Sequence, residues 1–156
     1  MTRAAIPARD RLIFAMDVPT VVAAHALADR LGDSVSFYKL GLELFMSGEA
    51  FSLLDALAGR DKQIFLDLKL FDVPATVAGA VRNLKGRGVT FATVHGNQAI
   101  MEAAAGAADG FGILAVTVLT SLDRGDLDDL GFQCDVEALV LSRARRAPAR
   151  GCAAER

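Results

Sequence analysis

The sequence predicts an α/β fold made of about five strand–helix units, with parallel strands in one sheet. Three observations support this prediction. Short apolar runs alternate with segments whose apolar residues recur at helical spacing, a strand-like run appears roughly every 25 residues, and a polar residue follows each run. Strands that are apolar throughout and alternate with amphipathic helices are typical of a parallel sheet covered by helices.

The expected strands are short apolar runs, and the expected helices carry one apolar stripe. The strands cover residues 12–16, 35–38, 64–66, 89–94 and 113–119. The helices cover residues 21–31, 50–58, 74–85, 98–107 and 135–146. Thr20 is suited to cap the first helix, Gly32 to end it, and Pro74 to begin the third. The acidic segment 123–129 is expected to be a polar turn.

A polar side chain follows each predicted strand: Asp17, Lys39, Asp67, His95 and Thr120. Because parallel strands end at the same edge of a sheet, we expect all five at one rim. A (β/α) barrel draws its site from several strands at this rim, whereas an open doubly wound sheet concentrates its ligand contacts at one switch point. No GxGxxG motif follows the first strand, so a dinucleotide-binding fold is disfavoured. The pattern therefore favours a TIM-type barrel.

Composition excludes several classes of function. The chain has 156 residues and a formal net charge of −2, with no tryptophan and no basic stripe, so nucleic acid is not expected as a partner. Its apolar runs are far shorter than the roughly 20 residues of a membrane span. Cys134 and Cys152 lack the spacing of a metal site and no leader segment is recognised, so we expect a cytoplasmic protein without a metal. The arginines at the end of the last helix are expected to be solvated: Arg143, Arg145 and Arg146.

The segment 65–72, FLDLKLFD, carries the strongest chemical signal. Asp67 and Lys69 are two apart on a segment expected to be extended, so their side chains should leave the same face of the sheet, and Asp72 follows in the loop. Carboxylates on either side favour the ammonium form of the lysine, which suits proton donation. Charge runs of this kind are common on surfaces, but this one lies among apolar residues, where charge is costly unless it is paired and used.

The segment FLDLKLFDVPAT resembles the signature of the orotidine 5′-phosphate decarboxylase family. Four further segments resemble other strands of that family in order: LIFAMDVPT, FYKLGLELF, TVHG and VTVLTS. The resemblance covers about residues 10 to 145. It implies cofactor-independent decarboxylation of orotidine 5′-phosphate to UMP in de novo pyrimidine biosynthesis, by a homodimer with shared active sites.

The resemblance also implies roles for individual residues. A charge-alternating catalytic array would consist of Lys39, Asp67, Lys69 and Asp72, with Lys69 as the proton donor. Substrate binding would fall to Asp17, Lys39, Thr76, Thr120 and Ser121. Asp17 would contact the ribose hydroxyls, and Thr120 and Ser121 the pyrimidine. Asp72 and Thr76 would reach the active site of the neighbouring subunit.

A complete barrel has eight strands and about 250 residues, whereas five strands are recognised here. We therefore expect residues 1–156 to form a single partial barrel from a C-terminally truncated or frameshifted member, with 147–156 as a non-native-like tail. The phosphate-binding loops after the seventh and eighth strands are not recognised, so little activity is expected from this chain alone. Two alternatives are open: a metal-dependent keto-sugar phosphate decarboxylase or aldolase of the same superfamily, and a non-catalytic remnant.

Overall fold

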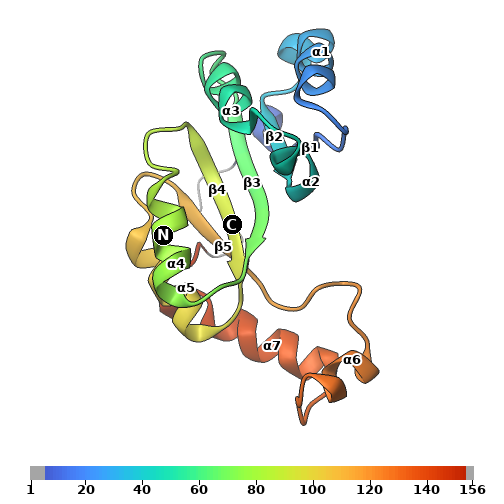
Figure 1. Cartoon of the computed structure of the whole chain (residues 1–156), viewed down its shortest axis with the longest axis vertical. Helices are drawn as coiled ribbons and strands as arrows, with labels where there is room; N and C mark the ends of the chain where they lie inside the picture. Colours follow the sequence, from blue (N-terminus) through green and yellow to red (C-terminus); the bar gives the residue numbers. More distant parts are fainter. Residues whose placement is uncertain (1–5, 154–156) are drawn as a thin grey trace. The chain divides into compact units, whose positions relative to one another are not determined.

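The structure, a computed structural model, describes residues 6–153 and confirms the α/β class. Five strands form one sheet in chain order: β1 (Phe14–Ala15), β2 (Phe37–Gly41), β3 (Gln63–Leu70), β4 (Val89–His95) and β5 (Gly112–Val116). The pairs β1–β2 and β2–β3 are parallel. Strand–helix repetition along the chain is visible in Figure 1.

Seven α-helices accompany the strands in the described part of the chain. They are α1 (Val21–Leu31), α2 (Leu42–Met46), α3 (Ala50–Ala58), α4 (Pro74–Arg82), α5 (Gln98–Ala107), α6 (Arg124–Asp129) and α7 (Val136–Arg146). Three short 3-10 helices are η1 (Ala8–Asp10), η2 (Gly32–Ser34) and η3 (Pro148–Arg150).

Helix ends follow the predicted capping residues. Thr20 accepts the N–H of Ala23 on its hydroxyl at 3.1 Å at the start of α1, and Gly32 ends that helix with a positive φ of 49°. Pro74 is the first residue of α4, where its missing N–H costs no hydrogen bond. These three predictions are confirmed.

Two helices were missed by sequence reasoning. The segment expected to be a polar turn contains α6, which begins with a capping box: Asp123 accepts the N–H of Asp126, and Asp126 accepts the N–H of Asp123. Only Leu127 of α6 is buried, so the helix has little apolar stripe to reveal it. The short α2 follows β2 directly and likewise buries one residue, Leu44.

Strand ends also differ from the prediction. β3 does not stop at Asp67 but continues through Lys69 to Leu70. β5 ends at Val116, so the prediction that it runs to residue 119 is wrong, and Thr120 lies in a turn beyond it.

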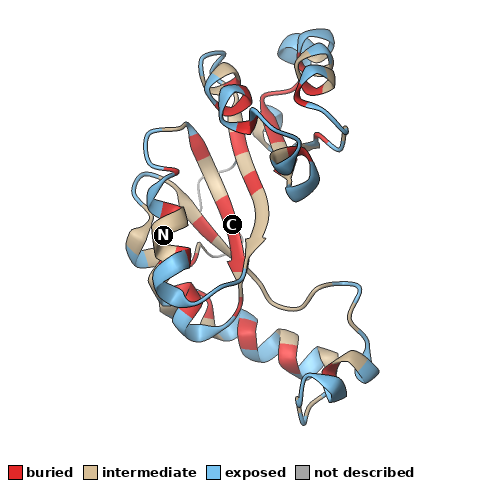
Figure 2. Cartoon of the chain, viewed as in Figure 1, coloured by how far each residue is buried: buried red, intermediate tan, exposed pale blue. Residues whose placement is uncertain are grey.

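The chain divides into two compact units. The first extends through Leu68 and includes Gly86–Phe91, and the second comprises Lys69–Lys85 and the residues from Ala92 onward. In the first unit, alternate strand residues are buried: Tyr38, Leu40, Ile64 and Leu66. Figure 2 shows this alternation as bands along the strands. Leu53, Leu54 and Leu57 of α3 are buried in the same unit.

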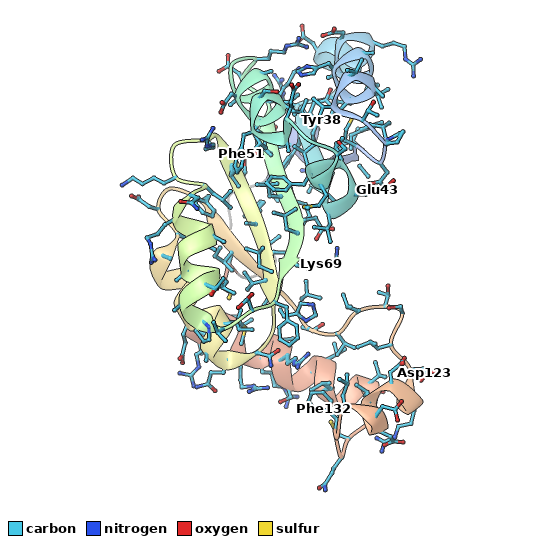
Figure 3. The ribbon with its side chains drawn as sticks, in the orientation of Figure 1. Tyr38, Glu43, Phe51, Lys69, Asp123 and Phe132 are labelled. Atoms are coloured by element: carbon cyan, nitrogen blue, oxygen red, sulfur yellow. The ribbon has the colours of Figure 1, made fainter. Side chains whose placement is uncertain are left out.

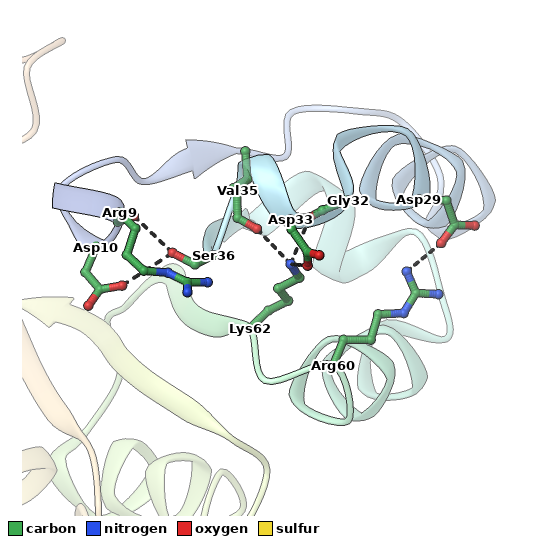
Figure 4. A network of polar contacts seen from close by, with 9 residues as sticks. All are labelled: Arg9, Asp10, Asp29, Gly32, Asp33, Val35, Ser36, Arg60 and Lys62. Atoms are coloured by element: carbon green, nitrogen blue, oxygen red, sulfur yellow. Dashed lines mark hydrogen bonds and ion pairs between the residues drawn. The ribbon is translucent and has the colours of Figure 1, made fainter. Parts of the chain in front are cut away.

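Polar contacts fasten loops within the first unit (Figure 4). Lys62 has a side chain only 9% exposed, and its ammonium donates to the carbonyls of Gly32 at 2.8 Å and Val35 at 3.0 Å while pairing with Asp33 at 3.5 Å. Ser36 donates its hydroxyl to the carbonyl of Arg9 at 3.0 Å. Lys62 therefore satisfies the carbonyl of Gly32 at the end of α1 and the carbonyl of Val35, which follows η2.

In the second unit, α4 and α5 pack side by side (Figure 1). Its buried residues include Val77, Val81, Met101, Ala104, Ile113 and Leu139. The C-terminal residues that the structure describes also pack here: Cys152 is buried, Arg150 pairs with Glu102 at 2.8 Å, and the N–H of Ala153 donates to the carbonyl of Ile113 at 2.7 Å. Residues 154–156 of the predicted tail lie outside the described residues.

Candidate active site

Three predicted site residues share one face of the first unit. In the β1–β2–β3 register, Ala15 pairs with Lys39, and Lys39 pairs with Phe65. Asp17 comes two residues after Ala15, and Asp67 comes two residues after Phe65. Because side chains alternate along a strand, Asp67 lies on the same face as Lys39. Asp17 lies just beyond the end of β1, and its contact with Lys39 places it at the same face.

The side chain of Lys39 contacts both carboxylates. Its Nζ donates a hydrogen bond to Asp17 Oδ1 at 3.3 Å and forms an ion pair with Asp67 Oδ2 at 3.8 Å. Exposure increases from Asp67 (15%) through Lys39 (24%) to Asp17 (70%). Opposite charges about 4 Å apart attract by roughly 4 kcal/mol at an effective dielectric near 20, before desolvation is subtracted. The arrangement thus orders a cation between two anions, with the outer anion open to a ligand.

Lys69 lies near the end of β3 and belongs to the second unit (Figure 3). Its backbone has a positive φ of 49°, which is uncommon for a residue with a side chain. Its N–H donates to the hydroxyl oxygen of Thr93 on β4 at 2.9 Å. Thr93 is only 5% exposed. The candidate proton donor is therefore attached to a buried side chain of the next strand.

The loop after β3 places Asp72 on the surface. Asp72, Thr76 and the two apolar residues that flank Asp72 are all exposed, Phe71 by 66% and Val73 by 62%. Asp72 accepts the N–H of Val73 on Oδ1 at 2.6 Å. The Phe71 ring packs against the imidazole ring of His95, with the two ring centroids 4.7 Å apart.

His95, at the end of β4, lies in a positively charged and partly buried environment. Burial is the main cause that lowers the pKa of its imidazole, followed by the charges of Arg143 and Lys69. Arg143 donates to the carbonyl of Thr117 at 2.6 Å. These surroundings favour a neutral histidine, which fits a packed residue at the rim better than a general acid.

Most of the chain matches one known protein family. A family model described as "Orotidine 5'-phosphate decarboxylase / HUMPS family" matches residues 10–154. The chain belongs to this family. The family resemblance and the TIM-type fold expected from the sequence are thereby confirmed.

Several relatives carry the decarboxylase name. The chain is 68% identical over 147 residues to orotidine 5'-phosphate decarboxylase of Methylococcus capsulatus, covering 94% of this chain and 61% of that protein. It is 54% identical over 155 residues to the Xanthomonas oryzae pv. oryzae protein of the same name, covering 97% of this chain and 64% of that protein. The chain thus spans less than two thirds of the length of these relatives.

Solved structures agree with the fold. Orotidine 5'-phosphate decarboxylase from Lactobacillus acidophilus superposes with a TM-score of 0.83 at 30% identity, covering 90% of this chain and 68% of that one. An uncharacterized conserved protein from Geobacillus kaustophilus gives the same TM-score at 29% identity, covering 90% and 70%. The five βα units of this family member therefore form an incomplete TIM-type barrel.

Two further residues predicted to bind substrate belong to the second unit of this family member. Thr120 and Ser121 lie in an exposed turn beyond β5 rather than at a strand end. Among residues 6–153, no group of three or more histidines, cysteines or acids is placed to hold a metal ion. Within the same range, no helix is long and apolar enough to cross a bilayer.

Two residues near the site were missed by sequence reasoning. Thr93 lies within a strand predicted from its apolar residues, where a lone hydroxyl was the available signal. Arg143 was predicted to be solvated, but it is only 9% exposed and its guanidinium lies 5.4 Å from the ring of Phe132. It comes one helical turn after the buried Leu139, so the i, i+4 spacing placed it on the buried stripe of α7.

Proposed function

We propose that the chain decarboxylates orotidine 5′-phosphate to UMP without a cofactor, as a cytoplasmic enzyme of pyrimidine biosynthesis. The observation that carries this proposal is the contact of the Lys39 ammonium with the carboxylates of Asp17 and Asp67. In the sequence, Lys69 comes two residues after Asp67. The names of the relatives support the choice of substrate.

In the proposed reaction, the bond between C6 and the carboxylate breaks, CO₂ leaves, and the electron pair stays on C6. The ammonium of Lys69 stabilises this carbanion and gives it a proton, after which Lys69 is reprotonated from water. A unit charge about 4 Å from the carbanion contributes roughly 4 kcal/mol at an effective dielectric near 20, or almost a thousandfold in rate. Electrostatic stabilisation by an ordered charge is therefore the main source of catalysis.

The remaining predicted residues receive their roles within the same proposal. Asp17 binds the ribose hydroxyls, the role that the family resemblance implies, and its carboxylate is the most exposed member of the ordered contact. Lys39 and Asp67 complete the charge alternation, and Lys39 also contacts the substrate. Thr120 and Ser121 contact the pyrimidine from their exposed turn.

A homodimer with shared sites is part of the proposal. Asp72 and Thr76, which would serve the neighbouring subunit, lie in an exposed segment with Phe71 and Val73. Large apolar side chains exposed together are typical of an interaction surface. Val73→Glu should lower the dimer fraction in sedimentation, whereas Val22→Glu, at a position 79% exposed on α1, should not. Equal sedimentation of both variants and the wild type would exclude this surface as the dimer contact.

The activity is tested with carboxyl-labelled orotidine 5′-phosphate and the purified 156-residue chain. Labelled CO₂ should be released without added metal, at the low rate expected of a chain in which the phosphate-binding loops are not recognised, and Lys69→Met should lower that rate roughly 100-fold or more. Lys85→Met is the control, because Lys85 is a surface lysine of the same unit, paired with Asp109 at 2.6 Å. Equal release by the wild type and Lys69→Met would refute the proposal. Turnover of a keto-sugar phosphate only with Mg²⁺ would replace it with the alternative within the superfamily.

A further inference from the structure

The backbone of Lys69 is held in a strained conformation. Three non-glycine residues in the described part of the chain have positive φ: Glu49, Asp61 and Lys69. The first two lie outside the strands, whereas Lys69 is within β3. In this region the Cβ atom crowds the backbone, so such a conformation persists only where the surroundings enforce it, and it tends to occur at functional sites.

The contact that accompanies this conformation comes from Thr93. Its hydroxyl oxygen accepts the N–H of Lys69 at 2.9 Å, whereas in a regular parallel ladder that N–H would donate to a backbone carbonyl. Thr93 is 5% exposed, so its hydroxyl is screened from solvent. The branched side chain of threonine has few available χ1 rotamers. Thr93 therefore offers Lys69 a fixed acceptor.

We propose that Thr93 is a positioning residue for Lys69: its hydroxyl holds the Lys69 amide in the left-handed backbone conformation that directs the ammonium to the reacting carbon. The proposal rests on the role given to Lys69 in the proposed function. Displacing a catalytic group by about 1 Å can cost on the order of 100-fold in rate, so a single backbone anchor is enough to matter. Thr93 itself transfers no proton and contacts no substrate.

The same two strands supply a matched control. Thr90 on β4 accepts the N–H of Ile64 on β3 with its hydroxyl at 3.3 Å, within the first unit. This is again a threonine hydroxyl bound to a backbone N–H of the neighbouring strand. Ile64 is a fully buried apolar residue without a chemical role. Thr90→Val therefore removes the same kind of bond away from Lys69.

The first measurement is hydrogen exchange of the Lys69 amide, followed by NMR together with the backbone chemical shifts of Lys69. Thr93→Val should speed exchange roughly tenfold or more, the factor expected for one lost hydrogen bond, and should move those shifts. Thr93→Ser, which keeps the hydroxyl, and Thr90→Val should leave both unchanged. If Thr93→Val fails to fold, Thr93→Ala and Thr93→Ser form the equivalent pair. An Lys69 amide equally protected in variants with and without the hydroxyl would overturn the proposal.

The second measurement is decarboxylation of orotidine 5′-phosphate by the same variants. Thr93→Val should lower kcat at least tenfold with KM nearly unchanged, and Thr93→Ser should restore most of kcat. Equal kcat for Thr93→Val and Thr90→Val would overturn the proposal. Amide exchange needs no substrate, so absent turnover in the wild type would defeat the proposed function while the exchange result still decides the anchoring of Lys69.

Discussion

Replacing Gly96 with alanine tests how closely the end of β4 packs against its neighbours in the second unit. The new Cβ would lie 2.8 Å from the carbonyl oxygen of Val116 and 3.1 Å from Cδ of Arg143. Both distances are shorter than the roughly 3.5 Å of a favourable contact. The backbone of Gly96 cannot easily move away from Val116, because the N–H of Gly96 donates to the same carbonyl at 2.9 Å.

The expected cost follows from these contacts. Overpacking costs about 1–3 kcal/mol, and weakening the hydrogen bond adds about 1 kcal/mol. Gly96→Ala should therefore lower the free energy of unfolding by about 2–4 kcal/mol. Urea titration followed by circular dichroism measures this as a lower midpoint, with the slope showing whether unfolding is still cooperative.

Gly106→Ala is the matched control. Gly106 lies in α5, and apart from its chain neighbours and the backbone of its own helix no heavy atom of the described residues lies within 4 Å of the added Cβ. Alanine is favoured over glycine within a helix by about 1 kcal/mol, so this variant should gain stability. The reasoning fails if Gly96→Ala unfolds within about 0.5 kcal/mol of the wild type, the usual range for a harmless surface change.

Three further predictions concern stability. Tyr38→Phe removes a buried hydroxyl that has no hydrogen-bond partner among the described residues, so the free energy of unfolding should stay equal or rise by about 1 kcal/mol; a clear loss in urea would contradict this. Lys62→Met leaves the carbonyls of Gly32 and Val35 without their donor and should cost about 1–3 kcal/mol in the same titration, and an unchanged midpoint would count against the contact. Because the pKa of His95 is lowered in the folded state, the unfolded chain binds more protons, so stability should fall as pH drops below about 6.5. His95→Gln should flatten that decline, and an equally steep decline in the variant would contradict the assignment.

Sequence patterns predicted the fold well where local chemistry determines structure. The cap at Thr20 and the proline at the start of α4 act within a few residues, so they are readable directly. The limits of α6 and β5 were not predicted. The capping box of α6 is local, but it is made by two aspartates in an acidic segment with little apolar burial, so the segment resembles a polar turn. β5 stops within a run that is still apolar, so no local residue marks its end.

The charged residues of the site could be predicted from the sequence, but the backbone conformation of Lys69 and its hydrogen bond to Thr93 could not. Asp17, Lys39 and Asp67 follow from polar residues at strand ends, and the register explains their contact. The spacing argument for Lys69 assumed an extended backbone, whereas its φ is positive, and no sequence pattern signals that conformation for a lysine. The anchoring hydroxyl of Thr93 comes from another strand, so it becomes evident only in three dimensions.

The alternation of side chains along β2 has a consequence for how this protein can change in length. Lys39 faces the carboxylates, while its neighbours Tyr38 and Leu40 are buried on the opposite face. Inserting or deleting one residue within the strand would exchange these faces, sending a charge into the apolar core and removing it from the site. A single-residue length change inside β2 would therefore destroy folding and chemistry together, whereas the same change in the turns of residues 83–88 would spare this register. Length changes in this protein should therefore be tolerated more readily in its loops than inside β2.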